Sequence, residues 1–210
     1  MNTKKLHYIS GITLSIFIGL HLFNHFYSLF GVAAHINLMN ILRLFYRNTV
    51  VEIILLLSVL VQIISGFKLI KNKKKINLSG FEKLHVWTGI YLSIFLIFHL
   101  AAVFGGRFYL HLNTNVYFGA AGLNTFPYNL FFTPYYSLAI ISVFGHIASV
   151  HKAKAKHNFI GLNPNKQAKI ILYFGFALTC IILFGLTNHF HGLTIPKEYN
   201  ILIGKWATRI

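Results

Sequence analysis

Five long runs of apolar residues constrain the fold of this chain more than any other feature. Each run holds about 20 residues, the length that an α-helix needs to cross roughly 30 Å of membrane hydrocarbon. Because backbone polar groups in lipid must find partners within their own segment, we expect an all-α, integral membrane bundle of five helices, formed by a single domain over residues 1–210. The runs lie near residues 8–30, 50–70, 84–104, 134–152 and 168–188.

The composition agrees with a membrane protein of several spans. Of the 210 residues, 56% are hydrophobic and 10% are charged, and the mean hydropathy is +0.63, values outside the range of soluble domains. The first run has no small-residue cleavage site, so we interpret it as a span rather than a removable signal peptide. Cys180 is the single cysteine. One cysteine excludes an intramolecular disulfide and a cysteine-rich metal site, so a metal bound here would be held by histidine.

The charge distribution predicts the orientation of the helices. The chain has 19 Lys and Arg against 3 Asp and Glu, a net charge of +16. Such an excess can indicate nucleic-acid binding, but the sequence has no nucleic-acid motif, and we predict no nucleic-acid partner. The cations gather instead in short loops, as the positive-inside rule describes, which predicts an N-terminus inside and a C-terminus outside. The inner segments hold Lys4, Lys5, Lys68, Lys71, Lys73, Lys74, Lys75, Lys83, Lys152, Lys154, Lys156, Lys166 and Lys169. The outer segments hold Arg43, Arg47, Arg107, Lys197, Lys205 and Arg209.

Two outer connections are long enough to have structure of their own. Residues 31–49 place apolar residues at helical spacing and include Arg43 and Arg47, which predicts an amphipathic helix over about 34–48 on the membrane surface. Residues 105–133 are rich in aromatic residues, Gly and Asn. A loop of that length commonly has a function or covers the bundle as a cap.

Polar residues inside the apolar runs fall at two depths. With a rise of 1.5 Å per residue, His21 and His99 each lie about 20 Å above the inner ends of their runs. Gln62 and His146 each lie about 18 Å below the outer ends of theirs. Alternate runs therefore pair His21 with His99 at one level, the His21/His99 tier, and Gln62 with His146 at a second level, the Gln62/His146 tier.

Two imidazoles that face each other across a helical bundle form the axial ligand set of a low-spin b-type haem. A single intramembrane histidine often serves only as an interhelical hydrogen-bonding residue. Matched pairs on alternate helices favour the haem interpretation, since ionisable groups in the membrane are costly and by default functional. Arg43, Arg47 and Arg107 lie near the His21/His99 tier and suit haem propionates, because guanidinium binds carboxylate in a bidentate manner; contact with lipid headgroups is the ordinary alternative.

Four stretches of the chain resemble the single-chain, five-helix cytochrome b subunit of succinate:quinone oxidoreductases and fumarate reductases. The stretch SGITLSIFIGLHLFNHF resembles the first haem helix of that family, in which the first histidine of H-L-x-x-N-H binds the iron. The second helix of the family is similar to VEIILLLSVLVQIISGFKL, the third to HVWTGIYLSIFLIFHLAAVFGGR, and the fourth to LAIISVFGHIASVHK. The resemblance implies a four-helix haem-binding core, a fifth helix, and a place in the bacterial inner membrane.

The resemblance also implies roles for individual residues. His21 and His99 match the ligands of the outer haem b, and His146 matches one ligand of the inner haem. Gln62 stands where the family has the second inner ligand, a departure that puts the inner haem in doubt. The implied function is a membrane anchor that passes electrons between an iron–sulfur subunit, docked with a flavoprotein subunit on the inner face, and a quinone in the lipid.

Several alternatives remain open from the residues. His25, one turn from His21 on the same helix face, could be the outer ligand instead, and His85 or His151 could replace the missing inner ligand. A stand-alone or sensory haem protein of the same fold, and a haem-free scaffold subunit, use the same helices. A di-iron hydroxylase is suggested by the H-x-x-x-H of His21 and His25, but such enzymes need many histidines on one face.

Overall fold

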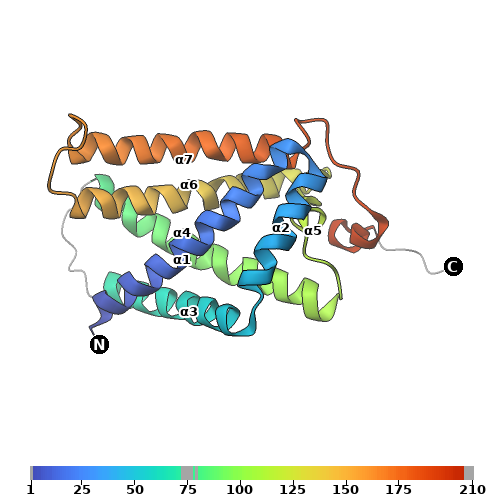
Figure 1. Ribbon diagram of the computed structural model, residues 1–210, viewed down its shortest axis with the longest axis horizontal. Helices are drawn as coiled ribbons and strands as arrows, with labels where there is room; N and C mark the ends of the chain where they lie inside the picture. The colour runs from blue at the N-terminus through green and yellow to red at the C-terminus, as the bar shows by residue number, and fades with distance from the viewer. Residues whose placement is uncertain (1, 72–77, 79, 206–210) are drawn as a thin grey trace.

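The computed structural model describes residues 2–71, 78 and 80–205, and those residues form helices and turns without a β-strand (Figure 1). Lys73, Lys74, Lys75 and Arg209, which contribute to the charge bias, lie outside the described residues. The elements are α1 (Thr3–Phe26), η1 (Tyr27–Phe30), α2 (Val32–Tyr46), α3 (Thr49–Lys71), α4 (Gly80–Phe104), η2 (Gly105–Tyr109), α5 (Val116–Ala120), α6 (Asn129–Lys154), α7 (Pro164–Leu186) and η3 (Lys197–Ile203).

The expected long apolar helices are confirmed. Among the described residues, five helical segments are long and apolar enough to cross a membrane, which indicates an integral membrane protein. They comprise Thr3–Phe30, Thr49–Lys71, Gly80–Tyr109, Asn129–Lys154 and Pro164–Leu186. A further helix, α2, occupies most of the range expected for the amphipathic helix.

Side-chain caps fix where several of these helices begin. The Asn2 side chain accepts a hydrogen bond from the Lys4 amide at the start of α1, and Asn163 does the same for Lys166 at the start of α7, where Pro164 occupies the first turn. Such caps satisfy amide groups that have no partner within the helix. At the other end of α7, Asn188 has φ 51°. Continued α-helix is impossible there, so α7 ends before residue 188.

The spanning helices pack as neighbours in two groups. The most extensive contacts join α1 to α3, α4 to α6, and α6 to α7, whereas α3 and α4 touch only sparsely. Figure 1 shows α6 and α7 side by side, with α1 running obliquely toward the C-terminal end of α7. We refer to the end that holds residues 2–7 and 152–166 as the N-terminal end, and to the end that holds α2, α5 and η3 as the α2 end.

The connection after η2 folds over the α2 end as a cap. Val116, Ala120 and Leu123 are almost fully buried and belong to one apolar cluster with Leu22 of α1 and Ile182 of α7. Tyr199 of η3 is also fully buried, and its hydroxyl donates to the Asn113 carbonyl at 2.9 Å. The cap expected from the length of the connection is therefore present.

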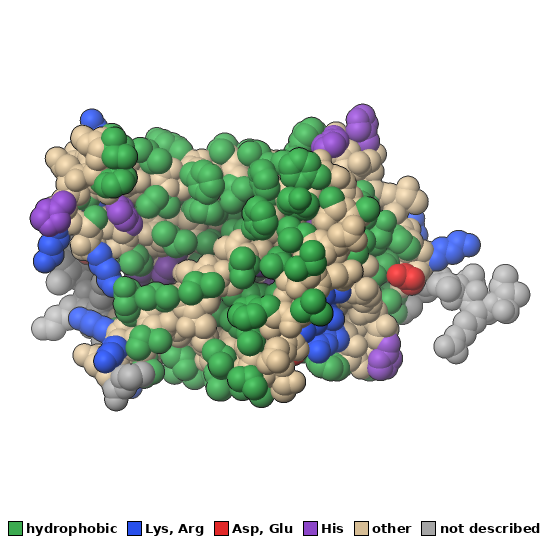
Figure 2. All heavy atoms as spheres, in the orientation of Figure 1, with side chains coloured by type: hydrophobic (Ala, Val, Ile, Leu, Met, Phe, Trp, Pro, Cys, Tyr) green, Lys and Arg blue, Asp and Glu red, His purple; other side chains and the backbone are tan. Residues whose placement is uncertain are grey.

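The surface is apolar around the middle and charged at the ends. Figure 2 shows apolar side chains across the waist of the molecule and Lys and Arg side chains toward the two ends. Large apolar side chains are exposed on all the spanning helices, for example Ile16, Leu57, Phe98, Phe131 and Phe174. An apolar belt between two charged ends is the surface that a bilayer requires.

Candidate functional site

A long cavity runs through the bundle between the α1·α3 wall and the α4·α6 wall. Its volume is about 1770 Å³, larger than the roughly 300–1,000 Å³ of most ligand pockets. Its lining extends from Asn2 and Lys152 at the N-terminal end to Arg43 and Thr114 at the α2 end. Both tiers of polar residues that the sequence predicts line this one cavity.

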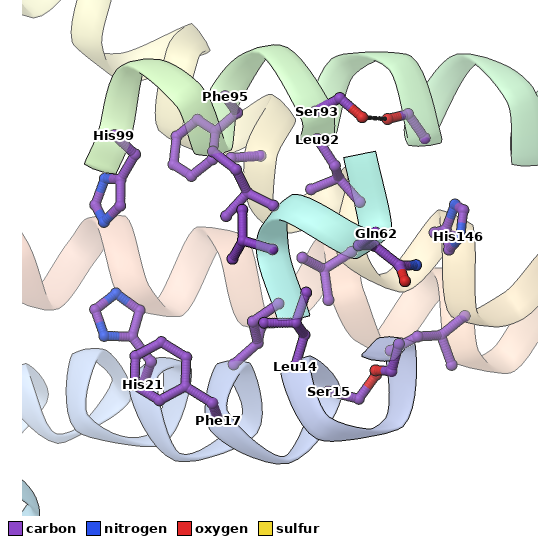
Figure 3. Close-up of a pocket in the computed structure, with 18 of the residues that line it drawn as sticks. Leu14, Ser15, Phe17, His21, Gln62, Leu92, Ser93, Phe95, His99 and His146 are labelled. Atoms are coloured by element: carbon purple, nitrogen blue, oxygen red, sulfur yellow. Dashed lines mark hydrogen bonds between the residues drawn. The ribbon is translucent and has the colours of Figure 1, made fainter. Parts of the chain in front are cut away.

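His21 and His99 face each other across the cavity toward its α2 end. His21 projects from α1 and His99 from α4, and the two side chains point toward one another (Figure 3). Their ring centroids lie 6.1 Å apart with an angle of 70° between the rings. The depth argument therefore places these two residues correctly at one level on opposite walls.

Each of these histidines is accompanied by a phenylalanine one turn earlier on its helix. Phe17 stacks on His21 at 5.8 Å, and Phe95 stacks on His99 at 5.1 Å. The pairs repeat one pattern, F-x-x-x-H, on two helices. Residues four apart lie on one helix face, so this repeated pattern is a sequence signal that the depth argument did not use.

The spacing of the two rings fits one metal ion between them. A metal–imidazole bond is about 2 Å and the ring centre lies about 1 Å behind the nitrogen, so two imidazoles on opposite sides of an ion have centres about 6 Å apart. Among the described residues, no group of three or more His, Cys, Asp or Glu side chains could hold a bare metal ion. Two histidines alone would therefore leave the remaining coordination positions of such an ion to ligands other than these side chains.

His25 belongs to the same helix and the same cavity wall as His21, and the two side chains are in direct contact. A hydrogen bond of 3.1 Å joins Nε2 of His25 to Nε2 of His21, and a second of 3.4 Å joins Nδ1 of His25 to Nε2 of His35. Binding of iron at Nε2 of either His21 or His25 would break their mutual hydrogen bond.

His35 and Asn24 extend this cluster and were not found from the sequence. His35 of α2 is 2% exposed, and its Nε2 lies 3.3 Å from Nδ2 of Asn24. Nδ1 of His35 and Oδ1 of Asn24 are buried without a partner among the described residues. Burial first, and the positive charge of Arg43 second, lower the pKa of His35 to about 4. His35 was missed because its helix was expected only to lie on the surface.

The three arginines line the α2 end of the cavity, as expected, but they are engaged differently. Arg43 donates to the Asn113 side chain at 2.9 Å, and Arg47 donates to Thr114 Oγ1 at 2.9 Å. Arg107 forms an ion pair with Glu52. Burial, and then the charge of Arg43 and Arg107, lower the pKa of Arg47. Among the described residues, Arg43 also meets Thr114 Oγ1, at 3.5 Å; both of its side-chain partners are neutral, so its positive charge stays available to an anionic group in the cavity.

The Gln62/His146 tier contains a third polar residue, His7, that the sequence analysis passed over. Ser10 donates to Oε1 of Gln62 at 2.6 Å, and Nε2 of Gln62 lies 3.2 Å from Nε2 of His7. The other ring nitrogen of His7 is 2.9 Å from Ser65 Oγ. Both nitrogens of His7 are therefore engaged within the α1·α3 wall. His7 lies near the end of the first run, where an interfacial histidine is ordinary.

On the opposite wall His146 packs against α4. Its ring stacks on His85 with centroids 4.2 Å apart, and its Nδ1 lies 3.4 Å from Thr88 Oγ1. His151, the other substitute ligand considered, instead contacts Gln167 of α7 at 2.7 Å. In the part of the chain that the structure describes, the tier thus holds hydrogen-bonded polar side chains, and the His146 ring stacks on His85 of its own wall and not on a ring of the opposite wall. This donor set does not fit a second bis-histidine haem.

Comparison with known proteins adds no relative. No protein-family model, no curated protein and no solved structure matches the chain. The functional argument therefore depends on the cavity and its residues.

Proposed function

We propose that this protein is the membrane-anchor cytochrome b subunit of a complex of the succinate dehydrogenase or fumarate reductase type. It binds haem b between His21 and His99 and passes electrons between an iron–sulfur subunit and a membrane quinone. The observation that carries the proposal is the pair of opposed imidazoles, with ring centroids 6.1 Å apart, inside a cavity of about 1770 Å³.

The residues around the cavity supply what such a cofactor requires. A bound b-type haem supplies a one-electron carrier in the membrane. His21 and His99 hold its iron, with His25 as the alternative to His21. Phe17 and Phe95 cover the imidazoles on the side toward the Gln62/His146 tier and exclude water. Arg43 and Arg47 lie at the α2 end of the same cavity and are positioned to bind the propionates, whereas Arg107 is already paired with Glu52.

The proposed topology places the N-terminal end on the inner face of a bacterial inner membrane. The described cations of that end, among them Lys68, Lys71, Lys83, Lys152 and Lys166, then face the cytoplasm as the positive-inside rule requires. A basic face also suits an acidic surface on the iron–sulfur and flavoprotein subunits.

A second candidate is a stand-alone or sensory haem-b protein of the same fold, and Gln62 favours it. With glutamine in the position of an axial histidine, the chain has one bis-histidine site, and electrons from an inner-face subunit would have a longer path to the haem. A haem-free scaffold subunit is the third candidate, and a purified protein without bound haem would favour it.

Purification from native membranes decides among these functions. A tagged copy expressed from its own locus should co-purify with a flavoprotein and an iron–sulfur protein, and the preparation should show the reduced-minus-oxidised difference spectrum of a b-type cytochrome. A spectrum without partner subunits would support the stand-alone protein. Partner subunits without a haem spectrum would support the scaffold.

A further inference from the structure

The Gln62/His146 tier places polar side chains on two facing walls of the cavity. His7 and Gln62 belong to the α1·α3 wall, and His85 and His146 to the α4·α6 wall, and all four line the cavity. Figure 3 shows Gln62 and His146 in the same part of the cavity, with Leu14 and Leu92 toward the histidine pair. Hydrogen-bonding groups that converge in an otherwise apolar cavity are the usual mark of a ligand site.

The orientation of Gln62 is fixed by its neighbours. Its Oε1 accepts from Ser10 and its Nε2 meets His7. A primary amide has two hydrogens and two oxygen lone pairs, so one hydrogen and one lone pair of Gln62 remain for a ligand. Rotation of the Gln62 amide would break its hydrogen bond with Ser10, so the amide N–H donor is held in place before a ligand binds.

A glycine of the neighbouring helix supports each polar side chain. A Cβ atom added to Gly11 would lie 3.4 Å from the Gln62 side chain, one added to Gly66 would lie 3.4 Å from His7, and one added to Gly89 would lie 3.4 Å from His146. The three glycines thus allow the polar side chains to lie against a helix backbone. This arrangement leaves the centre of the cavity open between the two walls.

The chemistry of these walls indicates the ligand class. The side chains named on both walls are one amide and three imidazoles, groups that hydrogen-bond without a fixed charge, and the cavity around them is lined by residues such as Ile63, Leu92 and Val143. A bound group should therefore be uncharged, apolar over most of its surface, and able to accept hydrogen bonds at two opposite sides. A quinone ring, with two carbonyl oxygens on opposite sides, has these properties.

We propose that the Gln62/His146 tier is the quinone-headgroup site of this protein, at the level where a second haem would otherwise lie. The headgroup binds between Gln62 on the α1·α3 wall and His146 on the α4·α6 wall. Its isoprenoid tail leaves between α3 and α4, where the contacts are sparse. This inference rests on the proposed function for its ligand class, but its location is independent of whether the His21/His99 tier holds haem.

Photocrosslinking with an azidoquinone tests the location directly. The full-length protein in lipid nanodiscs is irradiated with the probe, digested and mapped by mass spectrometry, with decylubiquinone as competitor. We expect competed labels on segments around residues 7–11, 62–66, 85–89 and 146. Absence of competed labelling, or labels confined to the segments around His21 and His99, would overturn the proposal.

Variants separate quinone binding from haem binding. In Gln62→Leu and His146→Leu, we expect labelling to fall about tenfold, the effect of one lost hydrogen bond to a desolvated group. Ser58→Ala is the matched control: Ser58 lies one turn from Gln62, its hydroxyl donates to the Ile54 carbonyl of its own helix, and its loss should leave labelling unchanged. Unchanged labelling in both leucine variants would contradict the proposal.

Haem content, measured on the same samples, distinguishes this inference from the proposed function. The leucine variants should keep the haem content of the wild type, which also shows that they are folded. A wild-type protein that takes up the label at the Gln62/His146 tier but contains no haem would refute the cytochrome function and leave the quinone site in place. Restored labelling in Gln62→Asn would identify the amide as the group that matters.

Discussion

Arg43 and Arg107 lie at the same end of the cavity but differ in the groups that they already bind. Arg107 is paired with the carboxylate of Glu52, whereas the side-chain partners that the described residues give Arg43 are the neutral Asn113 and Thr114. We therefore expect Arg43→Gln to weaken haem retention by roughly tenfold or more, the value of a charge-assisted hydrogen bond. Arg107→Gln should change it little. Haem loss to excess apomyoglobin measures both, and equal losses would show that Arg43 has no special part.

His35 makes the stability of the protein depend on pH. Its pKa in the folded protein is about 4, against 6.5 for an ordinary histidine. Between these values the unfolded chain binds a proton that the folded protein does not, so stability is full above pH 6.5 and falls as the pH drops toward 4, by roughly 3 kcal/mol in all. The groups around His35 are His25, Asn24 and Arg43.

The measurement for His35 is the thermal unfolding midpoint in detergent between pH 7 and 4.5. His35→Gln keeps a polar side chain without the titrating ring, so its midpoint should fall less steeply with acid than that of the wild type. Parallel curves for the two proteins would contradict the assignment.

For individual residues, the sequence predicts the depth of a side chain along its helix but not the contacts that the side chain makes with other helices. His21 and His99 follow from helical rise alone, because two residues at one level on alternate helices become neighbours in any bundle geometry that turns them inward. His35 and His7 do not follow. His35 lies in a helix outside the spans, and His7 lies near the end of a span. Only the packed structure shows that both belong to hydrogen-bonded clusters.

Among the helices, α7 and η1 approach too closely for a side chain at one position. A Cβ atom on Gly185 would collide with Ser28 and lie 2.9 Å from the Leu29 amide nitrogen. Because backbone cannot yield as a flexible side chain does, we expect Gly185→Ala to destabilise the protein by about 1–3 kcal/mol.

Gly19 provides the control for this contact. A Cβ atom there meets nothing within 4 Å, so Gly19→Ala should leave stability unchanged or raise it by about 0.5–1 kcal/mol through the gain in helix propensity. Unfolding midpoints of both variants in one detergent make the comparison. Similar midpoints would mean that α7 and η1 are not in tight contact.

The elements themselves were largely predictable because hydropathy marks long helices clearly. Their ends were less so, since caps and backbone conformation decide them. The fifth run was expected to reach residue 188, but the positive φ at Asn188 ends the helix earlier. The predicted amphipathic helix exists as α2, yet it buries His35 and Met39 while Leu44 is exposed. The spacing of apolar residues identified the two faces of this helix, but it did not show which part of the protein the buried face packs against.

For the molecule as a whole, the orientation in the membrane is the first testable consequence. In a Cys180→Ser background, Lys197→Cys at the α2 end should react with a membrane-impermeant maleimide in intact cells. Lys156→Cys at the N-terminal end should react only after the cells are permeabilised. The reverse pattern would mean that the basic end faces outward, against the positive-inside rule.

The cavity is the feature of the whole molecule that sequence reasoning could not supply. Hydropathy places helices in a membrane but does not say which pairs pack closely. Here α1 packs on α3, and α4 packs on α6, so the space between the two pairs stays open. The F-x-x-x-H pattern at Phe17–His21 and Phe95–His99 is the sequence feature that indicates this space, because both pairs project into it.

Haem stoichiometry tests the central claim most directly. We predict that a pyridine haemochrome assay of the purified protein gives one haem b per chain. His99→Ala should abolish it, and His146→Ala should retain it. Two haems per chain would contradict the assignment of the Gln62/His146 tier, and a wild-type protein without haem, purified from cells that supply it, would contradict the cytochrome function itself.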